Sequence, residues 1–282
     1  MTNKSLLSQY GLKWNPFTKE IPIEGLVQSP RIAEFCWRVE NLVMDGGFAM
    51  ITGEPGTGKS AALRLLFDKL SGLRELNVQA LERAQSNLAD FYRELGILFS
   101  VDFKVTNRFN AFKVLREKWQ SHIESTLFRP VLLIDEAQDM HQIVLSELRS
   151  ISSAHFDSRS IITVILCGDS RLPEKLGTSE LLPLKSRIRN RLITEPLPPK
   201  DLSEILFESI RKAGNPNLIS KEMIHTIAEH SMGNLRVMMN MSMELLEIAL
   251  KRELPSIDEK LFLEFYSQPK RIQGERTRSK NK

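Results

Sequence analysis

One short segment near the N-terminus combines glycines with a lysine and a hydroxyl group. Glycines at this spacing let the backbone curl, so that its N–H groups point into a concave anion site at a helix N-terminus. Lys59 would reach the β- and γ-phosphates of ATP, and the Ser60 hydroxyl would ligate Mg²⁺. A chance loop is the alternative, but the segment lies between a strand-like run and a helical pattern. We therefore predict an ATP site formed by Gly53, Glu54, Pro55, Gly56, Thr57, Gly58, Lys59, Ser60 and Ala61.

Two adjacent acids follow an apolar run in the middle of the chain. Residues 131–134 are Val-Leu-Leu-Ile, typical of a strand buried on both faces, and Asp135 and Glu136 come next. Such a strand places carboxylates at the carboxyl edge of the sheet, where ligand sites of α/β proteins form. We expect Asp135 to hold Mg²⁺ and Glu136 to polarise the water that attacks ATP. The alternative is a strand that ends in acids for solubility.

A third apolar run, residues 161–166, leads into Cys167-Gly168-Asp169-Ser170. A polar group that leaves a strand beside the one bearing the base can orient the attacking water. Asp169 is the first candidate for this task and Ser170 the second. A simple turn is the alternative.

These residues need a scaffold in which strands alternate with helices. Apolar runs of strand length predict strands at 48–52, 77–81, 131–134 and 161–166. Three- and four-residue apolar spacing predicts helices at 29–45, 59–70, 87–99, 110–125 and 144–153. This alternation predicts an α/β fold with a parallel sheet and helices on both of its faces.

The run Leu197-Pro198-Pro199 marks a predicted domain boundary. Beyond it the pattern is helical only, with helices predicted at 201–213, 220–230, 235–251 and 258–267. We predict a nucleotide-binding α/β domain over residues 1–197, which includes an N-terminal segment over 1–45. A small helical lid domain over 198–267 and a basic, disordered tail over 268–282 would follow.

Composition narrows the classes of function. Apolar residues make up 41% and charged residues 26% of the chain, as in soluble globular proteins. We find neither a secretory signal nor an apolar run near the roughly 18–20 residues that cross a bilayer, so we expect a cytoplasmic protein. Cys36 and Cys167 stand far apart outside any CxxC or Cys/His cluster, which argues against a disulfide or a structural metal.

The net charge of +4 is concentrated at the C-terminus. Residues 268–282 hold six basic residues and one acid, so the rest of the chain is close to neutral. Such a tail either contacts the phosphates of a nucleic acid or only keeps the protein soluble.

Taken in order along residues 5–255, these motifs resemble those of AAA+ ATPases. More narrowly, they resemble the branch that holds the general secretion pathway protein A type and the ATPases that help transposases choose targets (Mu B and its transposon relatives). The Asp-Glu-Ala-Gln string and the opening Gly-Leu-x-x-Asn-Pro-Phe are the most specific parts. The motifs are Tyr10-Gly11-Leu12, Asn15-Pro16-Phe17, Gly53–Ser60, Ile134-Asp135-Glu136-Ala137-Gln138, Leu166-Cys167-Gly168-Asp169, Ser186-Arg187-Ile188 with Arg191, and Gly233-Asn234-Leu235-Arg236.

The resemblance implies further roles. Arg236 matches the sensor-2 arginine, which reaches from the lid to the γ-phosphate. Arg187 and Arg191 lie where the family places its intersubunit arginine finger, with Arg189 as a neighbouring candidate, so hydrolysis would depend on a homo-oligomer, either a ring or a helical filament. Phe17 matches the segment near the adenine; a plain core phenylalanine is the alternative. For the arginines, the alternative is an ordinary solvated basic face. Members often have Gln where Asp169 stands.

The function expected from this resemblance is an ATPase that assembles on DNA and directs a transposase or another recombination protein to its target. Secretion-type members usually continue into a membrane helix and a peptidoglycan-binding domain, and this chain ends at Lys282 without them. That end and the basic tail favour the DNA-linked expectation. Candidate sequence-independent DNA contacts in the core are Lys104, Arg108 and Lys113, whose alternative is ordinary exposed charge.

Two other functions remain open at this point. The first is an ATPase of secretion or envelope assembly that acts on protein partners without DNA. The second is a nucleotide-dependent scaffold in which ATP binding matters and hydrolysis is slow.

Overall fold

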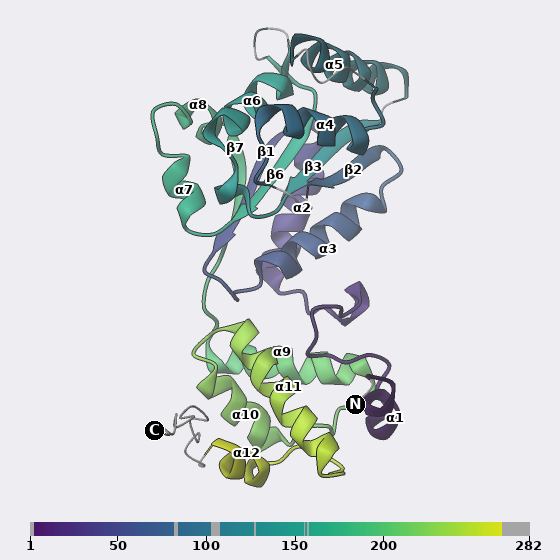
Figure 1. The fold of residues 1–282 in the computed structure, drawn as a ribbon, viewed down its shortest axis with the longest axis vertical. Coiled ribbons are helices and arrows are strands. Elements are labelled where there is room, and N and C mark those ends of the chain that lie inside the picture. Colours follow the sequence, from purple (N-terminus) through teal and green to yellow (C-terminus); the bar gives the residue numbers. More distant parts are fainter. Residues whose placement is uncertain are drawn as a thin grey trace, which may run out of the picture.

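The computed structural model describes residues 3–81, 84–102, 108–126, 128–154, 156 and 158–266. These residues form an elongated molecule with a larger α/β part and a smaller helical part (Figure 1). Among them, no helix is long and apolar enough to cross a membrane.

Five parallel strands form the central sheet of the α/β part, in the order β2-β3-β6-β1-β7. Two further short strands, β4 (Ser153–Ala154) and β5 (Arg159–Ser160), pair antiparallel with each other. The sheet strands are β1 (Gly47–Gly53), β2 (Leu76–Leu81), β3 (Arg129–Ile134), β6 (Thr163–Gly168) and β7 (Ile188–Thr194). This sheet confirms the predicted α/β fold class.

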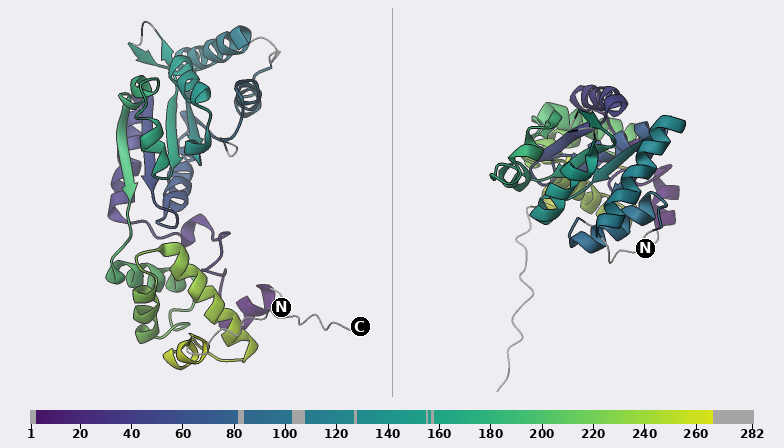
Figure 2. Two further views of the ribbon diagram at one scale, coloured as in Figure 1. Left: turned by 60° about the vertical axis from the view of Figure 1, so that its left-hand side comes forward. Right: turned by 90° about the horizontal axis from the view of Figure 1, so that it is seen from above.

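Helices cover both faces of the sheet (Figure 2). On one face α2 (Pro30–Asp45) and α3 (Lys59–Ser71) pack against side chains such as Ile51 and Leu133. On the other face, Met50 and Leu132, which precede Ile51 and Leu133 in their strands, face the other helices of the α/β part, because successive side chains of a strand point to opposite sides. These helices are α4 (Leu88–Leu98), α5 (Arg108–Ser125), α6 (Gln142–Ser152), α7 (Arg171–Lys175) and α8 (Leu182–Lys185).

The fifth strand, β7, has no counterpart among the predicted strands. It lies at the edge of the sheet and pairs only with β1. Its alternation is interrupted by charges, with Ile188 and Leu192 buried while Arg189 and Arg191 are exposed. An exposed edge strand needs no continuous apolar run, so the strand pattern was hidden among arginines.

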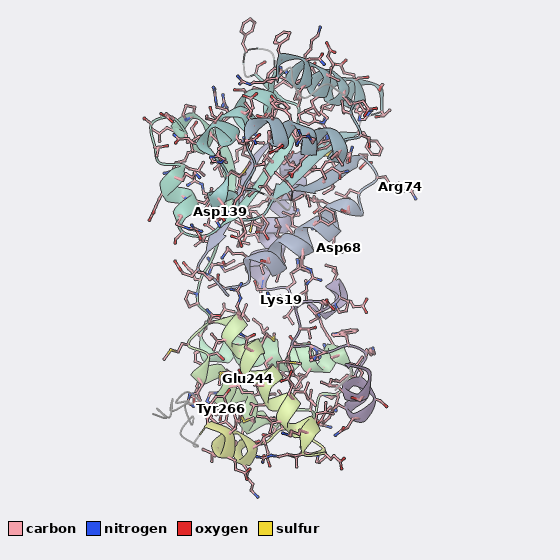
Figure 3. All side chains as sticks on the ribbon, viewed as in Figure 1. Lys19, Asp68, Arg74, Asp139, Glu244 and Tyr266 are labelled. Atoms are coloured by element: carbon pink, nitrogen blue, oxygen red, sulfur yellow. The ribbon has the colours of Figure 1, made fainter. Side chains whose placement is uncertain are left out.

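Beyond residue 198, the described residues form four helices that pack around one core of apolar side chains. They are α9 (Pro199–Ala213), α10 (Lys221–His230), α11 (Leu235–Lys251) and α12 (Glu259–Tyr266). Figure 3 labels Glu244 on α11 and Tyr266 on α12, whose hydroxyl donates a hydrogen bond to that carboxylate at 3.1 Å. The helices begin within two residues of the predicted starts.

The N-terminal segment differs from its predicted grouping with the α/β domain. Helix α1 (Asn3–Tyr10) and the turn after it pack into the core of the helical part, through Leu6, Tyr10 and Phe17. The Tyr10 hydroxyl also donates to the carbonyl of Leu254 at 3.0 Å. Residues 1–45 therefore divide, because α2 covers the sheet whereas α1 completes the helical core. The short η1 (Ile23–Gly25) lies between them.

Candidate nucleotide site

The phosphate loop connects β1 to α3, between Gly53 at the end of the strand and Lys59 at the start of the helix. Gly56 and Gly58 have φ angles of 85° and 101°, in the left-handed region that favours glycine. A Cβ added to Gly56 would lie 2.2 Å from Oδ1 of Asn234, so a larger residue would displace that contact. The loop is thus a backbone cradle at a helix N-terminus, as the sequence predicted.

Two side chains hold the loop in shape. The Lys59 ammonium group donates to the carbonyls of Gly53 at 2.8 Å and Glu54 at 3.0 Å, so it lies across the loop. The buried Thr57 hydroxyl donates to the carbonyl of Glu54 at 2.7 Å and shares a 2.7 Å hydrogen bond with Thr194. Because Thr194 ends β7, the edge strand also supports the phosphate loop.

The two acids lie one strand away from this loop. Strand β6 separates β1 from β3, and its Cys167 is aligned with Ile51 of β1. Burial raises the pKa of the Cys167 thiol, and the hydrogen-bonded carboxylate of Asp135 raises it further. Lys59 acts on this pKa in the opposite direction, and Glu136 adds a smaller increase. The lysine of the loop and both acids therefore lie close enough to this buried thiol to influence its pKa.

Glu136 occupies an unusual backbone position. Its φ and ψ angles are 51° and 39°, a left-handed conformation that non-glycine residues rarely adopt and that is enriched at functional sites. Its backbone N–H donates to the Asp135 carboxylate at 2.9 Å. Its own carboxylate accepts a hydrogen bond from the Gln138 side chain at 2.6 Å. Figure 3 labels the neighbouring Asp139, at the end of the sheet that faces the helical part.

Asp169 follows β6, where a group that orients water was predicted, but its carboxylate already has a partner. Arg171 donates from Nε to both of its oxygens, at 3.1 and 2.9 Å. The hydrogen bond to Arg171 lowers the pKa of Asp169. Ser170, the second candidate, caps α7 without a side-chain hydrogen bond. A role for Asp169 in orienting water stays a prediction.

The arginine-finger candidates lie before the start of β7 and in its first half, whereas the phosphate loop lies beside the end of this strand. In the register of β7 with β1, Ile188 aligns with Phe48 and Thr194 aligns with Gly53. Arg187 precedes the strand, so about 20 Å of extended chain separates it from the loop of its own molecule. Arg191 donates to the carbonyl of Lys185 at 3.4 Å, back toward α8, and Arg189 is exposed between them. Their role as an arginine finger stays a prediction.

The helical part touches the phosphate loop through the start of α11. The Asn234 side chain accepts hydrogen bonds from the backbone of Arg236 and Val237, which caps the helix. The same amide donates to the carbonyl of Pro55 at 2.9 Å, and the Arg236 N–H donates to the carbonyl of Gly56 at 3.3 Å. Arg236 is the second residue of α11, and it is exposed. The predicted sensor residue is therefore brought beside the predicted phosphate site.

Phe17 lies in the core of the helical part and is 6% exposed. Its backbone N–H donates to Oδ1 of the buried Asn15 at 3.0 Å, and the Asn15 amide contacts the sulfur of Met243 at 3.2 Å. This is the plain core phenylalanine weighed as the alternative; a contact with adenine stays a prediction.

The candidate DNA contacts in the core receive less support. Lys104 lies outside the described residues. Arg108 forms an ion pair with Glu147, whose side chain is 4% exposed, and the same carboxylate accepts a hydrogen bond from Tyr92. Burial and that hydrogen bond raise the pKa of Tyr92. Arg108 thus neutralises a buried acid that joins α4, α5 and α6, whereas Lys113 makes a 3.7 Å ion pair with Glu117.

Four residues that contact the candidate site have no role predicted from the sequence. Gln138 and Asn234 belong to the motifs Ile134–Gln138 and Gly233–Arg236, where their amides could have suggested hydrogen bonds to the neighbouring loops. Arg171 stands two residues after Asp169, a spacing compatible with an ion pair in a turn. Thr194 gave no signal, because its contact depends on the unpredicted strand β7.

The donor groups suit Mg²⁺. Ser60 offers a hydroxyl and Asp135 a carboxylate, both hard oxygen ligands of the kind that Mg²⁺ prefers. Lys59 supplies positive charge at the loop, where Gly56 and Gly58 adopt left-handed conformations and carry no side chains. The residues fit a magnesium nucleotide.

Comparison with known proteins agrees with this geometry. Residues 43–176 match the family described as AAA domain. General secretion pathway protein A of Aeromonas hydrophila is 29% identical over 213 residues, covering 73% of this chain and 37% of that protein. This chain therefore spans little more than a third of that relative's length.

Solved structures share the fold at low sequence identity. The ORC2 protein of Aeropyrum pernix, in ADPNP-ADP complexes, has a TM-score of 0.70 at 15% identity, covering 92% of this chain and 72% of that chain. The ORC1 protein of Aeropyrum pernix, in complex with DNA, has a TM-score of 0.66 at 17% identity, covering 89% of this chain and 68% of that chain. This chain therefore has the AAA+ P-loop fold, with a phosphate loop on a parallel sheet, and its residues 43–176 are similar to the AAA domain family.

Proposed function

We propose that this chain hydrolyses ATP in a Mg²⁺-dependent reaction centred on Lys59, Ser60, Asp135 and Glu136. The observation that carries the proposal is the convergence of these charges around the end of β6. In the register of the parallel sheet, Thr52 of β1 aligns with Gly168 of β6 and Ile134 of β3 aligns with Leu166 of β6. The phosphate loop and the two acids therefore leave the same edge of the sheet, on either side of β6. A loop of backbone N–H groups at the start of α3 supplies the anion site beside them.

Each residue has a defined task in this reaction. The loop and Lys59 hold the phosphates, while Ser60 and Asp135 hold Mg²⁺, which offsets negative charge on the phosphate oxygens. Glu136 orients the attacking water and takes its proton. The water oxygen bonds to the γ-phosphorus as the bond from that phosphorus to the bridging oxygen breaks, which leaves ADP and inorganic phosphate.

Substitution of the base tests this proposal. Glu136→Gln keeps the size of the side chain and removes its basicity, so we expect hydrolysis to fall by about 100-fold or more while ATP binding remains. Glu174→Gln is the matched control, because Glu174 is exposed on α7, outside the site. Hydrolysis is measured by phosphate release and binding by calorimetry. Unchanged turnover in Glu136→Gln would remove Glu136 as the base and overturn this mechanism.

We further propose that hydrolysis requires a second copy of the chain. Arg187 precedes β7 and Arg191 aligns with Met50 in the middle of β1, so both stand back from the end of the sheet that carries their own phosphate loop, and a head-to-tail neighbour could present either of them to its site. We expect Arg187→Ala or Arg191→Ala to keep ATP binding and lose most hydrolysis. Retained turnover with unchanged dependence on protein concentration in both variants would locate the finger elsewhere.

The proposed cellular role is a DNA-linked regulator that assembles on DNA with ATP and recruits a transposase or another recombination protein. It is supported by the resemblance of the motifs and by six basic residues in the C-terminal tail, outside the described residues. Because Arg108 is paired with a buried acid, the proposal now depends more on the tail than on α5.

A secretion-type ATPase that acts on protein partners is the second candidate. It is supported by the 29% identity to general secretion pathway protein A over 213 residues. It predicts ATP hydrolysis of the same kind with no dependence on DNA.

A mobility shift with arbitrary duplex DNA separates these two roles. The DNA-linked role predicts an ATP-dependent shift at about 50 mM salt that weakens strongly by about 200 mM, because phosphate contacts release counterions. A variant with the six tail residues changed to Gln should lose most of this shift and keep its ATP binding. No shift at low salt, with or without ATP, would favour the secretion-type role.

A further inference from the structure

Gln138 lies directly behind the two acids, in the single turn η2 (Ala137–Asp139), and is 5% exposed. Its side-chain amide uses both ends. Nε2 donates to the Glu136 carboxylate at 2.6 Å, and Oε1 accepts from the backbone N–H of Asp169 at 3.2 Å. One buried amide therefore connects the loop after β3 to the end of β6.

The surroundings of Gln138 restrict it to this arrangement. A Cβ added to Gly168 would lie 2.5 Å from Gln138 Oε1, so the glycine at the end of β6 makes room for the amide. The Lys175 ammonium group donates to the backbone carbonyl of Gln138 at 2.8 Å. Both the backbone and the side chain of Gln138 are thus anchored to the segment that follows β6.

Glu136 lacks comparable support of its own. It is exposed, and its backbone is in the left-handed region. Within the part of the chain that the structure describes, the Gln138 amide is the hydrogen-bond donor to its carboxylate. An exposed glutamate otherwise rotates among several conformers, and fixing one of them costs side-chain entropy.

We propose that Gln138 is a positioning residue for ATP hydrolysis, whose amide holds the Glu136 carboxylate in the orientation that takes the proton of the attacking water. This inference rests on the proposed function of Glu136 as the base. A carboxylate has two oxygens with about four acceptor sites, so the oxygen bound by Gln138 leaves the second one for water. The bridge to Asp169 sets that orientation relative to β6, which lies between the base and the phosphate loop.

Two isosteric variants test the role of the amide. Gln138→Met removes both hydrogen bonds, whereas Gln138→Glu keeps an acceptor for the Asp169 N–H and loses the donor to Glu136. Because misplacing a catalytic group by about 1 Å costs about 100-fold, we expect kcat to fall about 10- to 100-fold in both. The KM for ATP should stay within about twofold, since neither variant alters the phosphate loop.

A control and a double-mutant cycle distinguish positioning from a general structural effect. Gln142→Met is the control, because this side chain lies at the start of α6 and bonds only to Thr178 and Glu180 among the described residues. In a Glu136→Asp background the shorter carboxylate is out of reach of the amide. There Gln138→Met should cost less than about threefold in kcat, because contacting residues that act as a unit are not additive.

The outcomes separate this inference from the proposed function. If Glu136→Gln turns over ATP as well as the wild type, the proposed function fails. If Glu136→Gln loses turnover while Gln138→Met and Gln138→Glu keep the wild-type kcat, only the positioning role is overturned. It is also overturned if the losses multiply in the Glu136→Asp background. A loss of ATP affinity above about tenfold or of the folded state in both variants would identify Gln138 as a structural residue instead.

Discussion

The α/β part and the helical part contribute to the candidate site in different ways. In the α/β part the charged residues extend from strands whose two faces are buried in separate apolar clusters. The backbone positions of Lys59, at the start of α3, and of Asp135 and Glu136, directly after β3, are therefore set by the packed sheet and its helices. In the helical part a single core supports all the helices, and α11 meets the phosphate loop through hydrogen bonds at its first turn.

This difference suggests a working hypothesis in which the α/β part holds the reaction centre and the start of α11 acts as a sensor. The sheet is packed on both faces, whereas the hydrogen bonds that join α11 to the loop come from a side-chain amide and one backbone N–H. Such a contact can break without disrupting either core. We expect changes in the α/β part to abolish nucleotide chemistry and changes at the start of α11 to weaken its regulation.

The largest effect is expected from Lys59→Ala. The ammonium group is the cation that lies across the phosphate loop, so its removal should lower ATP affinity by at least about 100-fold, or about 3 kcal/mol. Calorimetric titration with ATP and Mg²⁺ measures this loss. Lys69→Ala is the matched control, because Lys69 lies on the same helix and pairs with Glu40. Tight ATP binding by Lys59→Ala would contradict the expectation that the α/β part supplies the principal phosphate contact.

A smaller effect is expected from Arg236→Ala. Its position at the first turn of α11 suits a charge that senses the γ-phosphate, so we expect about a tenfold weaker affinity for ATP, or about 1.4 kcal/mol. The affinity for ADP should change little, because ADP lacks that phosphate. Arg252→Ala at the other end of α11, where the arginine pairs with Glu264, serves as the control. Equal losses for ATP and ADP would contradict a sensor of the γ-phosphate.

The smallest effect is expected at Asn234, where two substitutions separate capping from contact. Asn234→Ala removes the cap of α11 and should lower the stability of the fold by about 1 kcal/mol. Asn234→Ser keeps a capping oxygen and loses the amide that donates to Pro55, so stability should be largely retained. Thermal unfolding measures the stability. Both variants should lose the same few-fold amount of ATP affinity. A normal affinity in Asn234→Ser would mean that the Pro55 contact does not couple the two parts.

Sequence patterns identified most of the scaffold, because its central strands and helices have strong periodicity. Helix α11 was predicted with its observed bounds, and β3 within two residues. The strand predicted at 161–166 was displaced: the apolar run begins at Ile161, but β6 begins at Thr163. Ile161 and Ile162 are buried outside the strand, so apolar character alone did not mark its start.

The parts that sequence missed depend on contacts between distant segments. Whether α1 packs with the sheet or with the helices cannot be derived from its own pattern, because both cores accept the same apolar side chains. The charge of Arg108 was visible, but its pairing with the buried Glu147 arises only when α5 packs on α6. The bond of Gln138 to Glu136 likewise depends on the left-handed turn at Glu136.

The burial of Cys167 has a practical consequence for following the motions of this protein. Its thiol is fully buried and its pKa is raised, so alkylating reagents, which attack the thiolate, should modify it very slowly in the folded chain. Labelling of this cysteine then requires the sheet to open locally beside the nucleotide site. The rate of its modification, followed by mass spectrometry with and without nucleotide, therefore reports the rate of that opening and requires no engineered probe.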